Sequence, residues 1–131
     1  MKKDVSSVKL VLTGLLLGVS LLLGQVQAKG PIAPSHSATI SVAQMPLEGA
    51  RVYDLISVGG PFPYEKDGAV FANRERLLPV KSRGYYREYT VSTPGARYRA
   101  TRRIVCGGQP RAPEACYFSA DHYASFRRIV P

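Results

Sequence analysis

The apolar positions that follow residue 45 predict one helix and then a series of short strands. Pro46 suits a first helical turn, and residues 47–58 carry apolar side chains at helical spacing before Gly59-Gly60 ends the pattern. Beyond it, short apolar and aromatic runs separated by turn formers indicate strands. The expected strands are 70–73, 85–92, 99–106, 116–119 and 125–130. This order predicts an α+β fold, with one N-terminal helix packed on a small antiparallel β-sheet.

Alternation along these strands predicts which charged side chains share a face of the sheet. Arg99 and Arg103 project together if their strand is regular. A hairpin that pivots about Pro94-Gly95 places Glu88 opposite Thr101, with the two arginines as its diagonal neighbours. Pro-Gly favours a type II turn, whereas two-residue hairpins favour types I′ and II′, so a longer loop is expected. A register shift of two residues keeps the shared face, and a shift of one destroys it.

The first 28 residues have the layout of a signal peptide. Three lysines precede an apolar run at 10–23, and the small-residue stretch 26–28 follows. The run is short for a membrane span, although a retained N-terminal anchor is the alternative. Cleavage after Ala28 leaves a Pro-, Ser- and Ala-rich flexible leader, 29–44, and one domain, 45–131. We therefore expect a secreted protein, extracellular or periplasmic, without stable membrane association after cleavage.

The chain is strongly basic, and its charges are unevenly placed. The net charge is +9, and removal of residues 1–28 lowers it to +7. Between residues 76 and 103, eight basic residues surround one acid, Glu88. This excess favours a polyanionic partner, because neutralising phosphates releases condensed counterions. Solubility or cell-surface adhesion is the alternative reason for the charge.

Cys106 and Cys116 are the only cysteines. In an exported protein an even number favours a disulfide over a metal site, and the turn-rich segment between them lets the chain reverse. Closing this loop would contribute about 3 kcal/mol by the chain-entropy estimate. Two free thiols in a reducing compartment are the alternative. The sequence has no Asp or His cluster suited to Mg²⁺ or Zn²⁺, so neither a metal nor another cofactor is expected.

Four side chains supply the groups that phosphodiester transfer requires. Glu88 can take a proton, Arg99 and Arg103 can hold a phosphate, and His122 can return a proton. Glu88 must be ionised and His122 protonated for this chemistry, so activity is expected to be bell-shaped in pH. Each residue taken singly also has a purely structural alternative. His122 alone could be a hydrogen-bonded turn residue, and Glu88 or Arg103 alone could be a member of a structural ion pair.

Six short motifs occur in one order along the chain: GPFPY at 60–64, DGAVF at 67–71, NRE at 73–75, GYYREYTV at 84–91, TPGAR at 93–97 and DHY at 121–123. Together they resemble the bacterial guanyl-specific ribonucleases, the family that includes barnase and the small secreted streptomycete enzymes. The resemblance extends from about residue 45 to residue 129. It implies the microbial ribonuclease fold and cleavage of single-stranded RNA 3′ to guanosine through a 2′,3′-cyclic phosphate.

The same resemblance implies a role for each member of the charged group. Glu88 matches the general base and His122 the general acid. Arg99 and Arg103 match the phosphate-binding arginines, and Tyr123 matches a tyrosine that lies near the same phosphate. We therefore expect a metal-independent, guanyl-specific endoribonuclease.

Base recognition is expected in the segment from Phe71 to Glu75. An ionised carboxylate such as Glu75 accepts from guanine N1–H and N2–H together, a pair that adenine lacks. The resemblance implies that backbone N–H groups around Asn73 and Arg74 meet O6, and that Phe71 packs near the base. Ala72 departs from the polar residue usual at its position, so a side-chain contact to the nucleotide is missing there.

The expected partners are single-stranded RNA and, by the resemblance, a barstar-like protein inhibitor, and the protein is expected to be a monomer. The alternative function is a cationic RNA-binding or inhibitor-binding protein of the same fold without efficient turnover. Every catalytic position is filled, which favours the enzyme. The sequence leaves open whether the biological role is nutrient scavenging or that of a toxin.

Overall fold

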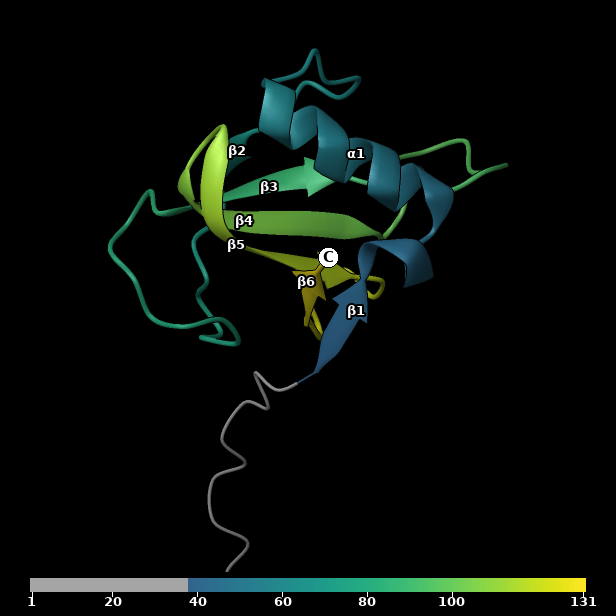
Figure 1. The fold of residues 1–131 in the computed structure, drawn as a ribbon. Helices are drawn as coiled ribbons and strands as arrows, with labels where there is room; N and C mark the ends of the chain where they lie inside the picture. The colour runs from purple at the N-terminus through teal and green to yellow at the C-terminus, as the bar shows by residue number, and fades with distance from the viewer. Residues whose placement is uncertain (1–37) are drawn as a thin grey trace, which may run out of the picture. The chain divides into compact units, whose positions relative to one another are not determined.

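The structure, a computed structural model, describes residues 38–131. The expected signal peptide and residues 29–37 of the expected leader lie outside the described residues. The elements are β1 (Thr39–Ser41), a 3₁₀ helix (Val42–Gln44), α1 (Leu47–Val58), β2 (Ala69–Val70), β3 (Tyr86–Thr90), β4 (Arg103–Gln109), β5 (Ala112–Ser119) and β6 (Arg127–Val130) (Figure 1). None of the helices in this part of the chain is long and apolar enough to cross a membrane.

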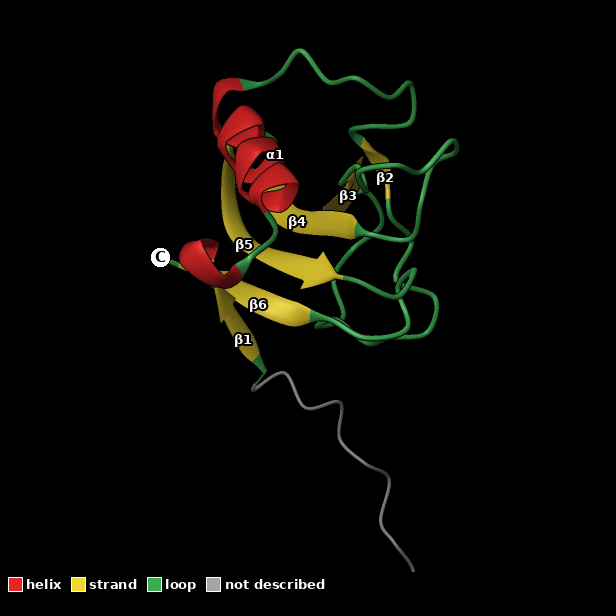
Figure 2. Cartoon of the chain, turned by 90° about the vertical axis from the view of Figure 1, so that its right-hand side faces the viewer, coloured by secondary structure: helices red, strands yellow, loops and turns green. Residues whose placement is uncertain are grey.

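The strands form one sheet in the order β1-β6-β5-β4-β3-β2. All neighbouring strands are antiparallel except β1 and β6, which are parallel. The helix α1 packs on one side of this sheet (Figure 2). The predicted α+β class, with one helix on a small sheet, is confirmed, and the parallel β1–β6 pair makes the sheet mixed.

The helix α1 has the predicted ends, and its apolar side packs on the sheet. Gly59 ends it in the left-handed conformation (φ 82°), which glycine adopts without the penalty of a Cβ. Val52 and Ile56 of the helix are buried with Ile104 and Phe118 of the sheet. The helix therefore covers one face of the sheet and leaves the other face for a different set of contacts.

The opposite face of the sheet has its own apolar cluster, built on Leu78, Tyr86, Val105 and Tyr117. Strand side chains alternate between faces, so Glu88 shares this face with Tyr86. Arg103 shares it with Val105 for the same reason. The candidate residues of β3 and β4 thus project away from α1.

The β3–β4 connection is longer than expected, which changes the register. Strand β4 begins at Arg103 instead of residue 99, and the N–H of Val91 bonds to the carbonyl of Arg102 at 3.1 Å, closing a loop of residues 91–102. Glu88 consequently pairs with Val105 and not with Thr101, the partner that a hairpin pivoting about Pro94-Gly95 would give it. Val105 lies four residues after Thr101, and because four is an even number, Glu88 still shares a face with Arg103 as predicted.

The other strand ends differ by smaller amounts. Strand β2 ends at Val70, β3 spans Tyr86–Thr90, β5 begins at Ala112 and β6 begins at Arg127. The side chain of Asn73 bonds to the backbone of Leu78, which turns the chain out of the sheet soon after β2. The predicted extension of that strand to residue 73 is therefore wrong.

The N-terminal part of the domain also differs from the prediction. Thr39–Ser41 pairs with β6, and Ile40 is 2% exposed. The hydroxyl of Ser41 then accepts from the N–H of Gln44, whose side-chain oxygen accepts from the N–H of Ser41. The prediction of a flexible leader is wrong for residues 39–44, because a three-residue strand with one buried side chain leaves no detectable period.

The predicted disulfide is confirmed. Cys106 and Cys116 lie directly opposite each other on β4 and β5, with their Cα atoms 4.1 Å apart, and form a disulfide bond. Both belong to the apolar cluster under α1. The bond therefore joins the two central strands on the face opposite Arg103.

Candidate active site

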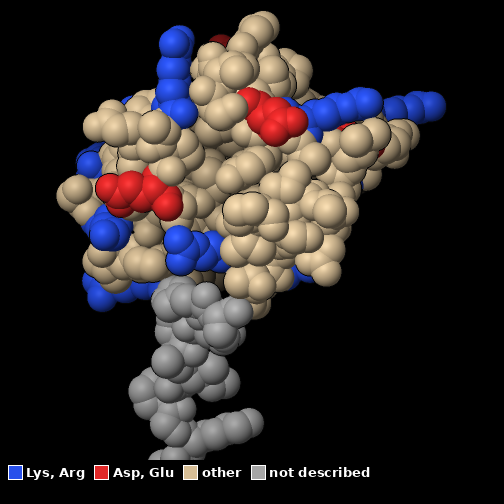
Figure 3. Space-filling model, viewed as in Figure 1, with Lys and Arg blue, Asp and Glu red and all other residues tan. Residues whose placement is uncertain are grey.

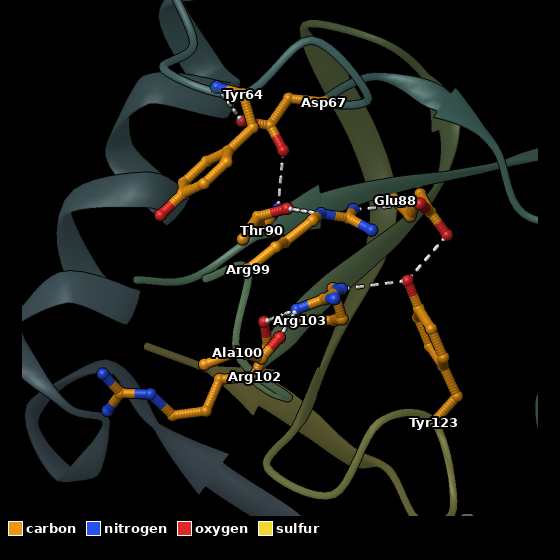
Figure 4. A network of polar contacts seen from close by, with 9 residues as sticks. All are labelled: Tyr64, Asp67, Glu88, Thr90, Arg99, Ala100, Arg102, Arg103 and Tyr123. Atoms are coloured by element: carbon orange, nitrogen blue, oxygen red, sulfur yellow. Dashed lines mark hydrogen bonds and ion pairs between the residues drawn. The ribbon is translucent and has the colours of Figure 1, made fainter. Parts of the chain in front are cut away.

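The carboxylate of Glu88, near the middle of β3, is held at both oxygens (Figure 4). A guanidinium nitrogen of Arg99 (Nη2) lies 3.1 Å from Oε1, and the hydroxyl of Tyr123 donates to Oε2 at 2.7 Å. The side chain of Glu88 is 15% exposed. Each oxygen can accept a further donor, so the carboxylate can receive the proton of a substrate hydroxyl from a fixed position.

Arg99 lies in the β3–β4 loop and reaches the carboxylate of Glu88 from there. The sequence had predicted it at the start of a strand, but β4 begins only at Arg103. Its Nε donates to the hydroxyl of Thr90 at 2.6 Å, while Nη2 donates to Glu88. Thr90 was not among the predicted site residues. Its position two residues after Glu88, on the same face of β3, is the signal that could have found it.

Arg103, the first residue of β4, is a buried cation at 2% exposure. Its Nη1 donates to the carbonyls of Ala100 and Arg102, and its Nε donates to the hydroxyl of Tyr123 at 3.1 Å. Within residues 38–131 the two ion pairs are Arg99–Glu88 and Arg102–Glu48, so Arg103 has no carboxylate within ion-pair distance. A buried guanidinium without a carboxylate partner is suited to bind an anion.

Tyr123 joins the charged residues to the aromatic side of the site. Its hydroxyl accepts from Arg103 and donates to Glu88. Its ring stacks on Phe71, with ring centroids 5.1 Å apart. Burial and the hydrogen bond to Glu88 raise the pKa of Tyr123, so the hydroxyl stays protonated and acts as a donor at neutral pH.

His122 lies in a turn whose backbone is strained. His122 and Tyr123 have φ values of 53° and 70°, in the left-handed region that residues other than glycine rarely adopt. The N–H of His122 donates to the carbonyl of Thr101 at 2.9 Å, and the N–H of Tyr123 donates to the hydroxyl of Ser119 at 3.0 Å. Such a conformation persists only where its surroundings hold it, and it directs two adjacent side chains to one site.

A cavity of about 490 Å³ connects these residues with the predicted base-recognition segment. It is lined by Val70, Phe71, Ala72, Asn73, Arg74, Glu75, Leu77, Glu88, His122, Tyr123, Ala124 and Phe126. All five residues expected to bind the substrate are in this lining, together with the expected base and acid. Arg99 and Arg103 are outside the lining and reach it through their bonds to Glu88 and Tyr123.

The segment predicted to recognise the base is shaped by the side chain of Asn73. Its amide nitrogen donates to the carbonyl of Leu78 at 2.9 Å, and its amide oxygen accepts from the N–H of Leu78 at 3.1 Å. The N–H of Arg76 donates to the carbonyl of Asn73, which leaves Arg74 and Glu75 at the two central positions of a turn. The N–H groups at those positions are free of the turn's own hydrogen bond, so they can meet a carbonyl on a ligand.

The sequence profile of the ribonuclease family matches residues 29–130. The chain belongs to the ribonuclease family. Guanyl-specific ribonuclease Sa of Kitasatospora aureofaciens is 50% identical over 93 residues, which cover 71% of this chain and 94% of that protein. Guanyl-specific ribonuclease St of Saccharopolyspora erythraea is 46% identical over 91 residues, covering 70% of this chain and 86% of that one.

Solved structures of a related ribonuclease have the same fold as this ribonuclease. A structure of ribonuclease Sa2 in complexes with mononucleotides has a TM-score of 0.67 and 46% identity, covering 72% of this chain and 94% of that one. A structure of ribonuclease Sa2 with guanosine-2′-cyclophosphate has a TM-score of 0.65 at the same identity, covering 72% of this chain and 96% of that one. The predicted family and the predicted microbial ribonuclease fold are therefore confirmed.

The surface of this ribonuclease is suited to a polyanion. Lysine and arginine side chains extend at several edges of the face shown in Figure 3, and fewer carboxylates are visible among them. Within the described residues, no group of three or more His, Cys, Asp or Glu side chains is placed to hold a metal ion.

Asp121 is a second residue that the sequence reasoning missed. Its carboxylate accepts from the hydroxyl of Ser119 at 3.0 Å, from the N–H of Ser125 at 2.9 Å and from the hydroxyl of Ser125 at 2.6 Å. Burial acts to raise the pKa of Asp121, but these hydrogen bonds outweigh burial and lower it. The spacing of Asp121 and Ser125, four residues apart with a short side chain at each end, is the signal of such a local bond.

Replacing Asp121 by Asn should lower the stability of the protein at neutral pH. It should also reduce the loss of stability that occurs as the pH falls. The folded pKa lies below the unfolded one, so this carboxylate stabilises the fold above about pH 4 and loses that effect as the pH falls through the folded pKa. Thermal unfolding from pH 7 to pH 2 measures both changes. Asp54→Asn, an exposed position on α1, is the matched control. An Asp121 variant with the acid profile of the wild type would contradict this role.

Proposed function

We propose that this ribonuclease is a secreted, guanyl-preferring endoribonuclease that cleaves single-stranded RNA 3′ to guanosine by transesterification. One observation carries the proposal: a single cavity is lined by Glu75 together with Glu88 and His122. A guanine bound at Glu75 therefore brings its own ribose and phosphate to the expected base and acid. The relatives above support this reading, because they are guanyl-specific ribonucleases.

In the first step Glu88 takes the proton of the ribose 2′-hydroxyl as its oxygen attacks the phosphorus. The bond from the 2′-oxygen to phosphorus forms, and the bond from phosphorus to the 5′-oxygen of the next nucleotide breaks. His122 gives its proton to that 5′-oxygen, which leaves as a hydroxyl. One proton enters Glu88 and one leaves His122, so the products are a 2′,3′-cyclic phosphate and a free 5′-hydroxyl.

The arginines and Tyr123 act on the phosphate during this step. Arg99 and Arg103 neutralise the phosphate and the further charge that develops on it, and their planar forks orient its oxygens. Arg103 is fixed by its bonds to backbone carbonyls and to Tyr123, so it needs little reorganisation as the charge develops. Tyr123 holds the carboxylate of Glu88 and the guanidinium of Arg103 in one arrangement.

Hydrolysis of the cyclic phosphate uses the same two groups in exchanged roles. His122, now without its proton, takes a proton from water as the water oxygen attacks phosphorus. Glu88, now protonated, returns its proton to the 2′-oxygen as the bond from phosphorus to that oxygen breaks. The product is a 3′-phosphate, and both side chains recover their starting protonation.

Replacing Glu75 by Ala should relax the base preference. The variant lacks the acceptor for guanine N1–H and N2–H, and two hydrogen bonds to a charged group correspond to a loss of about 10²-fold or more in kcat/KM for guanosine substrates. Cleavage after adenosine should change little, so the ratio of the two rates measures the effect. Glu65→Ala, which removes an exposed carboxylate outside the cavity lining, is the control. Full guanine preference in the Glu75 variant would refute the assigned pocket.

The proposed function is tested by mapping the cleavage of a single-stranded oligoribonucleotide that contains all four bases. We expect cuts after G, fragments that first end in a 2′,3′-cyclic phosphate, and the same products in the presence of EDTA. Cuts at every base with equal rates would refute the guanine preference. Binding of the RNA without any cleavage would support the alternative, an RNA-binding protein of this fold without turnover.

A further inference from the structure

Tyr98, in the β3–β4 loop, presents an aromatic ring to solvent. It is 77% exposed and is the one exposed phenylalanine or tyrosine among residues 38–131. Arg97, beside it, is exposed as well. The loop that carries them projects beyond the end of β3 (Figure 1), and basic side chains extend on the same side of the molecule (Figure 3). An exposed ring next to a guanidinium is the combination that binds a base and a phosphate of single-stranded RNA.

The two ends of the β3–β4 loop are tied to the sheet and the helix, so Tyr98 is held out from the surface. Arg99 is bonded to Thr90 and Glu88. Arg102 donates to the carbonyl of Ser92 and to the hydroxyl of Thr93, and it pairs with Glu48 of α1 at 3.5 Å. These contacts flank Tyr98 on both sides in sequence. The ring is therefore supported by a fixed base and has its faces available to a ligand.

The position of His122 tells which nucleotide would meet this ring. The backbone N–H of His122 donates to the carbonyl of Thr101, and the hydroxyl of Thr101 donates to the carbonyl of Ala120, so the His122 turn lies against the end of the β3–β4 loop. The guanine side of the cavity, at Glu75, is in a different loop. The β3–β4 loop thus borders Glu88 through Arg99 and the His122 turn through Thr101.

We propose that Tyr98 and Arg97 form a binding subsite for the nucleotide on the 3′ side of the cleaved bond. This inference rests on the proposed function, in which His122 protonates the 5′-oxygen of that nucleotide. The departing nucleotide therefore lies on the His122 side of the phosphate, next to the β3–β4 loop. Its base stacks on the ring of Tyr98, and the next phosphate pairs with Arg97. A purine stacks over more of the ring than a pyrimidine does, so the subsite favours a 3′ adenosine over a 3′ uridine.

The test compares substrates that differ only in the downstream base. The first is guanylyl-3′,5′-adenosine, the second has an abasic ribose in place of adenosine, and the third is guanosine 2′,3′-cyclic phosphate, which has no downstream nucleotide. For Tyr98→Ala we expect a loss of about 10-fold in kcat/KM on the first substrate and less than about 2-fold on the other two. Tyr98→Phe keeps the ring and should match the wild type on all three.

Arg97 is tested on a longer substrate, because its phosphate lies one nucleotide further along. With guanylyl-adenylyl-adenosine, Arg97→Ala should reduce the slope of log kcat/KM against log salt by about 0.7, the value for one phosphate contact on a single strand. Arg111→Ala, an exposed arginine of the β4–β5 turn, is the matched control and should leave the slope unchanged.

The outcomes separate this inference from the proposed function. Equal activity of Tyr98→Ala and the wild type on all three substrates would overturn the subsite and leave the proposed function standing. An equal loss on all three would also overturn it, because Tyr98 would then act on the catalytic centre or on folding. If the wild type cleaved none of the guanosine substrates, the proposed function would fail and the subsite with it.

Discussion

Glu88→Gln is expected to lower kcat for RNA cleavage by about 10²- to 10⁴-fold with little change in fold. The amide has the shape of the carboxylate, and its oxygen can still accept from Arg99 or from Tyr123. Neither amide atom can take a proton from the 2′-hydroxyl, so the attacking oxygen loses its base. The measurement is kcat and KM on guanylyl-3′,5′-adenosine, with thermal unfolding as the check that the variant is folded.

The matched control for this change is Glu114→Gln. Glu114 accepts from the hydroxyl of Tyr85 at 2.5 Å on an exposed part of the sheet, and it is absent from the cavity lining. It should change kcat by less than about 2-fold, because surface substitutions away from a site have small effects. A Glu88→Gln variant that keeps more than a tenth of wild-type kcat would show that Glu88 is a positioning residue and another group is the base.

His122→Ala is expected to have a large effect that depends on the leaving group. For RNA the leaving 5′-oxygen is a poor leaving group unless it is protonated, so loss of the acid should lower kcat/KM by about 10²-fold or more. A guanosine 3′-(4-nitrophenyl phosphate) releases a stabilised phenolate that needs no proton. On that substrate the same variant should lose less than about 10-fold.

The comparison between the two substrates also separates the roles of Glu88 and His122. Glu88 acts on the nucleophile, so Glu88→Gln should lose activity to a similar extent with both leaving groups. His122 acts on the leaving group, so the two losses should differ. Equal losses for His122→Ala on both substrates would contradict its role as the acid and would assign it to substrate binding or to the strained turn.

The parts of the fold that the sequence predicted are those with strong local signals. The helix Leu47–Val58 was predicted at both ends, because Pro46 and Gly59-Gly60 mark them. The start of β4 was not predicted, because residues 99–102 have a strand-like composition. The bonds of Arg99 to Glu88 and of Arg102 to Glu48 hold them in the loop. These are long-range contacts, which periodicity does not contain.

The candidate site was predicted better than the strand that was thought to build it. Strand parity placed Glu88 and Arg103 on one face, and an even register difference preserved that result. Arg99 reaches Glu88 from a loop, by a route that the sequence did not indicate. Thr90 and Asp121 were missed because they act through other residues, the first on Arg99 and the second on the turn that carries His122.

Some expectations from the sequence stay predictions. They concern the cleavage after Ala28 and secretion, the monomeric state, and recognition by a barstar-like inhibitor. The inhibitor would have to cover the cavity that holds Glu75 and Glu88, because blocking that cavity prevents both base recognition and proton transfer. Its effect on cleavage is therefore the measurement that would identify it.

The central claim is that the ribose 2′-hydroxyl of a guanosine is the nucleophile. It is tested with an oligoribonucleotide that contains one guanosine and with the same strand in which that guanosine alone is 2′-deoxy. The account predicts cleavage 3′ to the guanosine of the first strand, with a 2′,3′-cyclic phosphate at the new end, and an intact second strand. Cleavage of the second strand after the deoxyguanosine would contradict it, because Glu88 would then have no hydroxyl proton to take.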